Sequence, residues 1–196
     1  MSFLSDYCTF SRLTEALVQN TLPFDCGHRD LNDFFEKECH GYSKELLGKS
    51  YCFLLSEDPR ILVCAFTLSN DSIKVNFIPN SRRKRVSRRI PRQKQFRSYP
   101  AVLIGRLGVN NSFKGMGVGH ELMDFIKTWF LEPENKTGCR FLVVDSYNEV
   151  NPLNYYGRNG FDFVFSTEDQ EKEYMGQAAS SLLATRLMYF DLMLVA

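Results

Sequence analysis

Apolar and polar positions along this chain form short strand-like runs and longer runs with helical spacing. The apolar runs predict strands at Tyr7–Leu13, Ser50–Ser56, Arg60–Leu68, Ala101–Val109, Arg140–Ser146, Phe161–Phe165 and Ala184–Leu194. Apolar residues at helical spacing predict helices over Leu31–Leu47, residues 118–130 and Pro152–Asn159, the first with Asp30 as N-cap. Such a mixture predicts one α/β domain with a mixed sheet, and 196 residues are enough for one core.

Three glycines at alternate positions, Gly115, Gly117 and Gly119, separate the strand at Ala101–Val109 from the amphipathic helix that follows. Glycines at a helix start leave backbone amides uncovered, and these amides together with the helix dipole favour a bound anion. The spacing matches neither a Walker-A loop nor a dinucleotide-binding fingerprint. A tight turn that requires positive φ is the plain alternative to a phosphate site.

A second motif lies downstream, where Tyr156 precedes Gly160 and Phe161 in the pattern Tyr-x-x-x-Gly-Phe. The loop Lys114–Gly119 resembles the Arg/Gln-x-x-Gly-x-Gly/Ala pyrophosphate loop of GNAT-superfamily N-acetyltransferases, with Lys in the first position. Loop, helix, strand, short helix and Gly-Phe strand also follow the order of that family. The resemblance implies an α/β fold of GNAT type: a mixed, mostly antiparallel sheet with splayed central parallel strands, flanked by helices.

The same resemblance implies an acyltransferase that uses acetyl-coenzyme A. The expected cofactor-binding residues are Leu107, Gly108, Val109, Lys114, Gly115, Met116, Gly117, Val118 and Gly119. Tyr156 is the expected catalytic general acid, because an ordinary phenol keeps its proton at neutral pH. Tyr155 is interpreted as a packing aromatic. No general base is evident, and a weakly basic amine such as that of an aminoacyl ester would need little help.

Charge is distributed unevenly along the chain, although the net charge is only +1. Residues 72–120 hold twelve Lys or Arg and no Asp or Glu, and nine of these cations fall within Ser81–Arg97. Such a segment favours a polyanionic partner. We therefore expect a long basic loop with some helix at 79–99 that binds RNA, with candidate contacts at Arg82, Arg83, Arg85, Arg88, Arg89 and Arg92. An acidic protein partner and a disordered basic loop are the alternatives.

Residues Phe24–Gly27, read FDCG, and Leu31–Phe34, read LNDF, are similar to the N-terminal signature of toxin-type GNAT enzymes. Residues Ile104–Val109, read IGRLGV, are similar to their Leu-Gly-Arg-Leu-Ala-Val strand, with Gly108 and then Asn110 in place of Ala and Asp. The resemblance covers about Phe24–Phe161 and leaves residues 166–196 as a longer C-terminal extension. It implies acetylation of aminoacyl-tRNA, a homodimer and an antitoxin partner.

Two other functions stay open: acetylation of a small-molecule or protein amine, and a non-catalytic RNA-binding module. The remaining sequence features bear on the cellular compartment and on metal binding. No apolar run is long enough for a membrane span, and no signal peptide is apparent. Six unpaired Cys and three scattered His predict buried free thiols and no metal site, which suits the cytoplasm.

Overall fold

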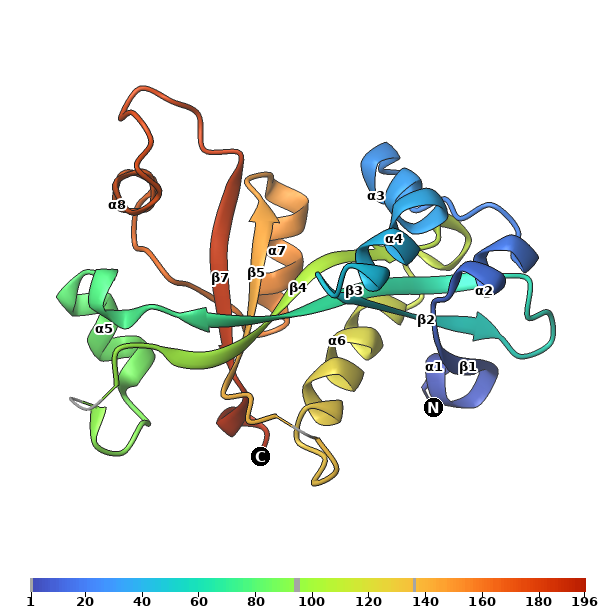
Figure 1. The fold of residues 1–196 in the computed structure, drawn as a ribbon, viewed down its shortest axis with the longest axis horizontal. Coiled ribbons are helices and arrows are strands. Elements are labelled where there is room, and N and C mark those ends of the chain that lie inside the picture. Colours follow the sequence, from blue (N-terminus) through green and yellow to red (C-terminus); the bar gives the residue numbers. More distant parts are fainter. Residues whose placement is uncertain (1, 94–95, 136) are drawn as a thin grey trace. The chain divides into compact units, whose positions relative to one another are not determined.

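The fold was described from a computed structural model, which covers residues 2–93, 96–135 and 137–196. Its seven-stranded sheet has the order β1-β2-β3-β4-β5-β7-β6 (Figure 1). The strands are β1 (Cys8–Arg12), β2 (Lys49–Leu55), β3 (Leu62–Ile73), β4 (Tyr99–Val109), β5 (Phe141–Tyr147), β6 (Asp162–Phe163) and β7 (Thr185–Asp191). The recorded pairings are antiparallel except for β4 with β5, which are parallel and paired only from Ala101–Leu103 to Phe141–Val143, although both strands continue.

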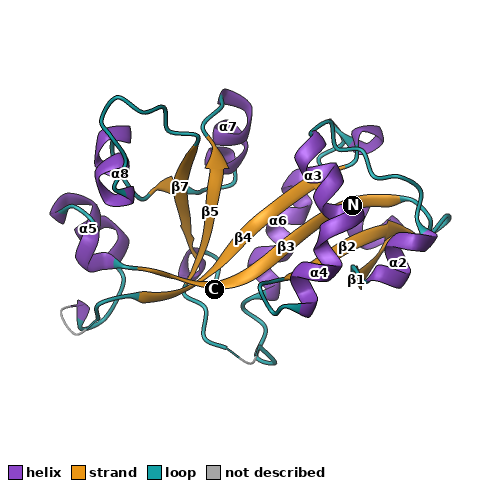
Figure 2. Cartoon of the chain, turned by 45° about the horizontal axis from the view of Figure 1, so that its top comes forward, coloured by secondary structure: helices purple, strands orange, loops and turns teal. Residues whose placement is uncertain are grey.

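Helices flank these strands (Figure 2). The α-helices are α1 (Phe3–Tyr7), α2 (Glu15–Asn20), α3 (Arg29–Asp33), α4 (Cys39–Lys44), α5 (Asn80–Ser87), α6 (Val118–Trp129), α7 (Val150–Arg158) and α8 (Glu168–Met175). A π-helical turn, η1 (Phe34–Glu38), joins α3 to α4, and 3₁₀ turns occur at η2 (Val75–Phe77), η4 (Asn111–Phe113) and η5 (Leu192–Leu194). Within the described residues, every helix is too short or too polar to span a bilayer.

The chain divides into two compact units, and the first comprises residues 1–69 and 104–129. Its strands alternate their side chains between two cores. On one face Cys52 and Leu54 of β2 pack with Phe34 and Phe35 of the α3–α4 segment. On the other face Tyr51 and Phe53 meet the aromatic rings of Trp129 and Phe125 of α6 edge-on. The sheet of this unit is therefore covered on both sides, which explains its nearly continuous apolar strands.

The second unit comprises residues 70–103 and 130–196. The central strand β5 pairs with β7 along its whole length, from Phe141 opposite Asp191 to Tyr147 opposite Thr185. Phe141 and Val143 belong to a buried cluster that also contains Val86 of α5 and Phe165 before α8. The final strand of the chain thus lies between β5 and β6 and completes this part of the sheet.

Most predicted elements are confirmed within a few residues, and two differ. The predicted N-cap Asp30 is wrong: α3 begins at Arg29 after His28, so Asp30 lies in the first turn. The polar connection predicted over residues 166–181 contains the helix α8. The basic segment forms α5 over residues 80–87, and Lys94 and Gln95 of that segment lie outside the described residues. Neither helix has the apolar periodicity from which helices were predicted.

Candidate functional site

The glycine loop belongs to the first unit and joins the end of β4 to the start of α6. Asn110 turns the chain: its backbone N–H donates to the Val63 carbonyl at 2.9 Å, and its side-chain oxygen accepts from Ser112 N at 3.0 Å. Its Nδ2 donates to the Leu62 carbonyl at 3.0 Å. Asn at this position therefore caps the 3₁₀ turn and ties it to β3, in place of the Asp that the resemblance led us to expect.

Gly115 and Gly117 both have positive φ, +79° and +85°. A Cβ atom built on either glycine meets no other atom within 4 Å, so the space beside this backbone is open. Among the described residues, no hydrogen bond is recorded from the N–H groups of residues 115–118. Free amides at the start of a twelve-residue helix fit an anionic group such as a pyrophosphate. Positive φ and an open approach are both present, so the tight-turn and anion-site interpretations are compatible.

Lys114 is engaged with the protein itself: its Nζ donates to the Cys26 carbonyl at 2.7 Å. Asp25 completes this contact between the segment 24–27 and the loop. Its carboxylate accepts from Gly27 N at 2.8 Å, from Asn32 Nδ2 at 2.9 Å and from Asn111 Nδ2 at 2.8 Å. The hydrogen bonds from Gly27 and Asn32 are the main reasons that the pKa of Asp25 is lowered.

This Asp25 cluster, comprising Asp25, Gly27, Asn32, Asn111 and Lys114, gives the N-terminal motif a physical role. It holds the turn that precedes the glycine loop, because Asn111 N also donates to the Asp25 carbonyl at 2.8 Å. The two motifs selected from the sequence, whose contacting residues Cys26 and Lys114 are 88 positions apart, are therefore neighbours.

Gly108 explains another departure from the expected strand pattern. A Cβ at this position would lie 3.1 Å from Cys26 Sγ and 3.2 Å from the Phe24 ring. The strand end that carries Leu107, Gly108 and Val109 is thus packed tightly by the 24–27 segment. A side chain at position 108 would crowd the support of the loop.

Tyr156 belongs to the second unit, on α7, and the Gly-Phe part of its motif ends that helix. Phe161 N donates to the Tyr156 carbonyl at 3.0 Å, across Gly160 with φ +82°. Phe161 is buried, and its ring lies 5.4 Å from that of Tyr156 and 5.7 Å from that of Phe190. This is a helix C-terminus closed by a left-handed glycine and an apolar contact, which fixes the backbone of Tyr156.

The Tyr156 side chain is half-buried, and its ring meets Tyr155 edge-on at 5.1 Å between centroids. No hydrogen bond from its hydroxyl to a described residue is recorded, and burial raises its phenol pKa far above the usual value. A phenol in this state holds its proton at neutral pH and suits the role of acid rather than base. The pKa of Asp145, a carboxylate of β5, is raised first by burial and then by the negative charge of Asp71.

The six candidate arginines of the basic segment divide into two groups. Arg82 is only 8% exposed; its guanidinium donates to the carbonyls of Phe163 and Val164 and lies 3.5 Å from Asp162. Arg85 pairs with the same carboxylate. These two arginines attach α5 to β6, and Arg82 is not available to a ligand.

The other arginines face outward. Arg88, Arg89 and Arg92 are exposed, and Arg83 is half-buried and donates to Asn80. Lys84 and Arg97, which were not among the candidates, are exposed as well. The surface that the structure leaves for an anion therefore differs from the predicted set by the loss of Arg82 and the gain of these two cations.

Glu121 is a structural residue of the site that sequence reasoning missed. It accepts from Ser2 Oγ, Phe3 N and Leu4 N at 2.9–3.0 Å, so α1 is fixed to the first turn of α6. Burial alone would raise its pKa, but these hydrogen bonds outweigh that effect and lower it. An acid in the first helical turn was the available signal, since it also complements the helix dipole.

No family model matches the sequence. Solved structures do match along nearly the whole chain. A tyrosine-to-phenylalanine variant of KacT has a TM-score of 0.71 at 20% identity, covering 97% of this chain and 98% of that one. AtaT complexed with acetyl-methionyl-tRNAfMet has a TM-score of 0.65 at 19% sequence identity, and the match covers 96% of each chain. A tyrosine-to-phenylalanine variant of the AtaT toxin, bound to the C-terminus of the antitoxin AtaR and acetyl-CoA, has a TM-score of 0.62 at 18% identity. That match covers 97% of this chain and 96% of that one.

The chain has the GNAT fold. The predicted fold class is thus confirmed, including a mostly antiparallel sheet with one parallel pair. In this GNAT fold the glycine loop and Tyr156 occupy the two places for which the sequence motifs selected them: the turn between β4 and α6, and the short helix after β5.

Proposed function

We propose that this chain is an N-acetyltransferase that moves an acetyl group from acetyl-coenzyme A to the amino group of aminoacyl-tRNA. The observation that carries this proposal is the open glycine loop, with two positive-φ glycines and free amides at the start of α6, in a chain with the GNAT fold. The matched AtaT structures support it, because they contain acetyl-methionyl-tRNAfMet and acetyl-CoA.

Acetyl-coenzyme A would supply an activated acetyl thioester. The amides of residues 115–118, beside Gly119, would bind its pyrophosphate, and the β4 residues Leu107, Gly108 and Val109 would line its pantetheine arm. We assign Lys114 a supporting role, since its ammonium already holds the Cys26 carbonyl beside the loop. Its charge still adds to the positive potential there.

Tyr156 is the proposed general acid: as the amine nitrogen bonds to the acetyl carbon and the carbon–sulfur bond breaks, the Oη proton goes to the departing sulfur, and the proton lost by the amine passes to solvent, from which Tyr156 is reprotonated. Burial raises the pKa of Tyr156, so the phenol stays protonated at pH 7–9 and its titration should not limit the reaction in that range. The chain offers no evident base, and an aminoacyl ester, whose amine is less basic than a lysine side chain, requires little assistance.

The acceptor assignment rests on charge. Arg83, Arg88, Arg89 and Arg92, with Lys84, give the basic segment an outward-facing cationic surface that suits an RNA backbone. We further propose both units as parts of one acetyltransferase domain, the cytoplasm as its compartment, and a second copy and an antitoxin as its partners. The antitoxin-bound AtaT structure supports the last of these. A protein or small-molecule amine is the competing acceptor.

The test is transfer of labelled acetyl groups from acetyl-coenzyme A to bulk charged tRNA, comparing Tyr156→Phe with Tyr155→Phe. We expect Tyr156→Phe to slow transfer at least about 100-fold, because it removes the general acid. The adjacent Tyr155→Phe is the matched control and should retain most activity. Calorimetry of coenzyme binding should give the same affinity for both variants and the wild type.

Three other outcomes would change the proposal. Equal activity of the two variants would remove Tyr156 from the mechanism. Transfer to small amines or protein lysines without transfer to charged tRNA would replace the acceptor. Absence of coenzyme binding in the wild-type protein would leave the fold without acetyl transfer and favour the RNA-binding module.

A further inference from the structure

An open groove of about 670 Å³ lies within the second unit, and its lining includes neither Tyr156 nor any residue of the glycine loop. One wall is the segment from Lys74 to Arg83, which contains η2 and the start of α5. The other wall is one side of α8, with Gln170, Glu173 and Tyr174. Among the lining residues only Arg83 was a candidate site residue from the sequence, and the helix α8 was not predicted.

The first wall is fixed from beneath. Val75 and Ile78 are buried, 2% and 5% exposed, in the core cluster of this unit. The short 3₁₀ turn between them leaves the Phe77 ring outside that core, and this side chain is 69% exposed. The buried residues on either side therefore hold this exposed ring at a defined place on the wall of the groove.

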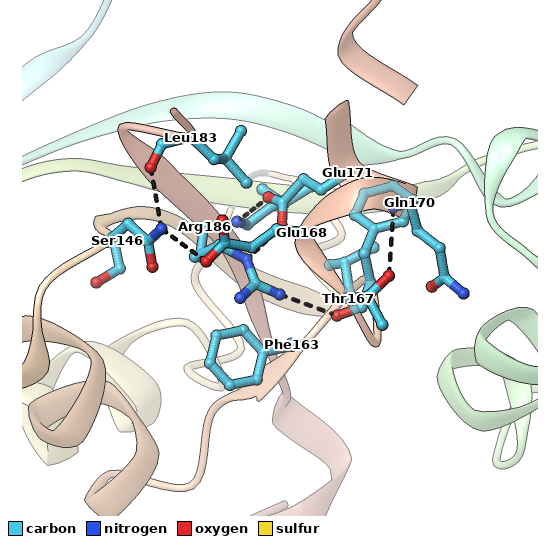
Figure 3. Close-up of polar contacts among 12 residues, drawn as sticks. Ser146, Phe163, Thr167, Glu168, Gln170, Glu171, Leu183 and Arg186 are labelled. Carbon is cyan, nitrogen blue, oxygen red and sulfur yellow. Dashed lines mark hydrogen bonds and ion pairs between the residues drawn. The ribbon is translucent and has the colours of Figure 1, made fainter. Parts of the chain in front are cut away.

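The second wall is held by polar contacts (Figure 3). Thr167 caps α8 by accepting from Gln170 N at 3.3 Å. Glu171 is 1% exposed, pairs with Arg186 Nε at 2.7 Å and also accepts from the backbone N–H of Leu187 at 2.5 Å. The same arginine donates to the Phe165 carbonyl at 3.3 Å. These bonds attach α8 to β7 and fix which of its faces lies toward the groove.

Tyr174 is placed by this attachment. Its ring lies 4.9 Å from that of Phe165, between centroids, and its side chain is 39% exposed. The groove therefore carries an exposed aromatic ring on each wall, and neither ring depends on a flexible loop for its position.

The remaining lining groups suit a nucleic acid. Lys74 and Arg83 supply two cations against the single carboxylate of Glu173, and Asn76, Asn80 and Gln170 supply amides. Sites for unpaired nucleotides combine stacking rings with cations along the backbone path, and amide side chains can pair with base edges. An acidic peptide would use the cations but leave the two rings without a specific partner.

The charge also continues beyond the groove. Arg83 belongs to α5, whose Lys84 is exposed, and the exposed Arg88 and Arg89 follow directly. We propose that this groove binds an unpaired nucleotide of an RNA, with its base against Phe77 or Tyr174 and its phosphates at Lys74 and Arg83. This inference rests on the proposed function only in its choice of RNA as the polyanion.

The experiment measures fluorescence anisotropy of two labelled RNAs: a single strand of about 12 nucleotides and a fully paired duplex of equal length. Phe77→Ala should weaken binding of the single strand about tenfold without changing its salt slope, because stacking releases no counterions. Phe77→Trp should restore it and Phe77→Leu should not. Duplex affinity should change little in all three variants.

Tyr7→Ala is the matched control, since Tyr7 is another exposed aromatic ring, 49% exposed, and belongs to the first unit. It should leave both affinities unchanged. The stacking site would be overturned if Phe77→Ala and Tyr174→Ala both bound the single strand as tightly as the wild type. It would also be overturned if Phe77→Leu kept the full wild-type affinity for the single strand. Failure of the wild-type protein to bind the single strand would overturn it as well.

Acetyl transfer, measured separately, distinguishes the two proposals. If acetyl groups are transferred to charged tRNA and Phe77→Ala does not affect RNA binding, only the nucleotide site in the groove is refuted. If RNA binding depends on Phe77 and no acetyl group is transferred to charged tRNA, aminoacyl-tRNA is refuted as the acceptor and the nucleotide site stands.

Discussion

The glycine loop and the basic segment were both predicted to bind anions, but they differ in how much of that prediction the structure bears out. The loop Lys114–Gly119 has the properties expected from its sequence: two glycines with positive φ and open backbone beside them. The basic segment was treated as one cationic patch, yet Arg82 is buried and, with Arg85, ties α5 to β6. A glycine motif specifies backbone conformation directly, whereas a cluster of cations does not reveal which of them face water.

The strongest test of this difference is Arg82→Met, which keeps the aliphatic stem and removes the guanidinium. The carbonyls of Phe163 and Val164 would lose their donor, and Asp162 one of its two partners. We expect unfolding to become easier by about 2–4 kcal/mol. Urea unfolding measures this, and the exposed Arg88→Met should change the free energy of unfolding by less than about 0.5 kcal/mol. Equal losses in both variants would show that the two groups of arginines do not differ.

The corresponding test of the loop is Gly117→Val. A β-branched side chain at φ +85° is strained, and it would fill the open space beside the amides. The affinity for acetyl-coenzyme A should fall about tenfold or more. The control is Gly105→Ala, where the added Cβ also meets nothing within 4 Å but no positive φ is required. Calorimetry that gives equal coenzyme affinity for both variants would show that the loop is only a tight turn.

Replacing the exposed arginines should change the affinity for RNA rather than the stability of the fold. Replacing Arg88 and Arg89 with Ser should weaken binding of charged tRNA and reduce its salt slope by about one for each residue. Titrations at several salt concentrations measure this slope. An unchanged slope would mean that these side chains contact no phosphate and that the segment is only a solvated surface.

The smallest effect should come from the Asp25 cluster, which holds the turn before the loop. The pKa of Asp25 is lowered in the folded protein. Its ionised carboxylate therefore contributes fully to stability above the ordinary Asp pKa, and this contribution is lost as the pH falls through the pKa of Asp25 in the folded protein. Thermal unfolding should therefore show an acid-side loss of stability that is weaker in Asp25→Asn. If the acid-side curves of both proteins coincide, these hydrogen bonds do not contribute to stability.

The strands, the helix after the glycine loop and both motifs were predictable because each depends on local pattern. Apolar runs identified β2 and β5, and helical spacing identified α6 from Val118 to Trp129. Residues that act through distant partners were not predictable. Nothing local shows that Lys114 would bond the Cys26 carbonyl, or that Glu121 would hold the N-terminal helix.

The helices α5 and α8 show most clearly what local sequence patterns cannot predict. Their sequences, NSRRKRVS and EDQEKEYM, lack an apolar stripe, and tertiary contacts of Arg82 and Glu171 hold them in place. The sequence by itself determined the order of the strands, the backbone character of the loop and the candidate tyrosine, because these follow from local patterns of apolar and glycine residues. Only the tertiary structure decided which cations are free and that Phe77 and Tyr174 share a groove, because burial and long-range hydrogen bonds depend on residues far apart in the chain.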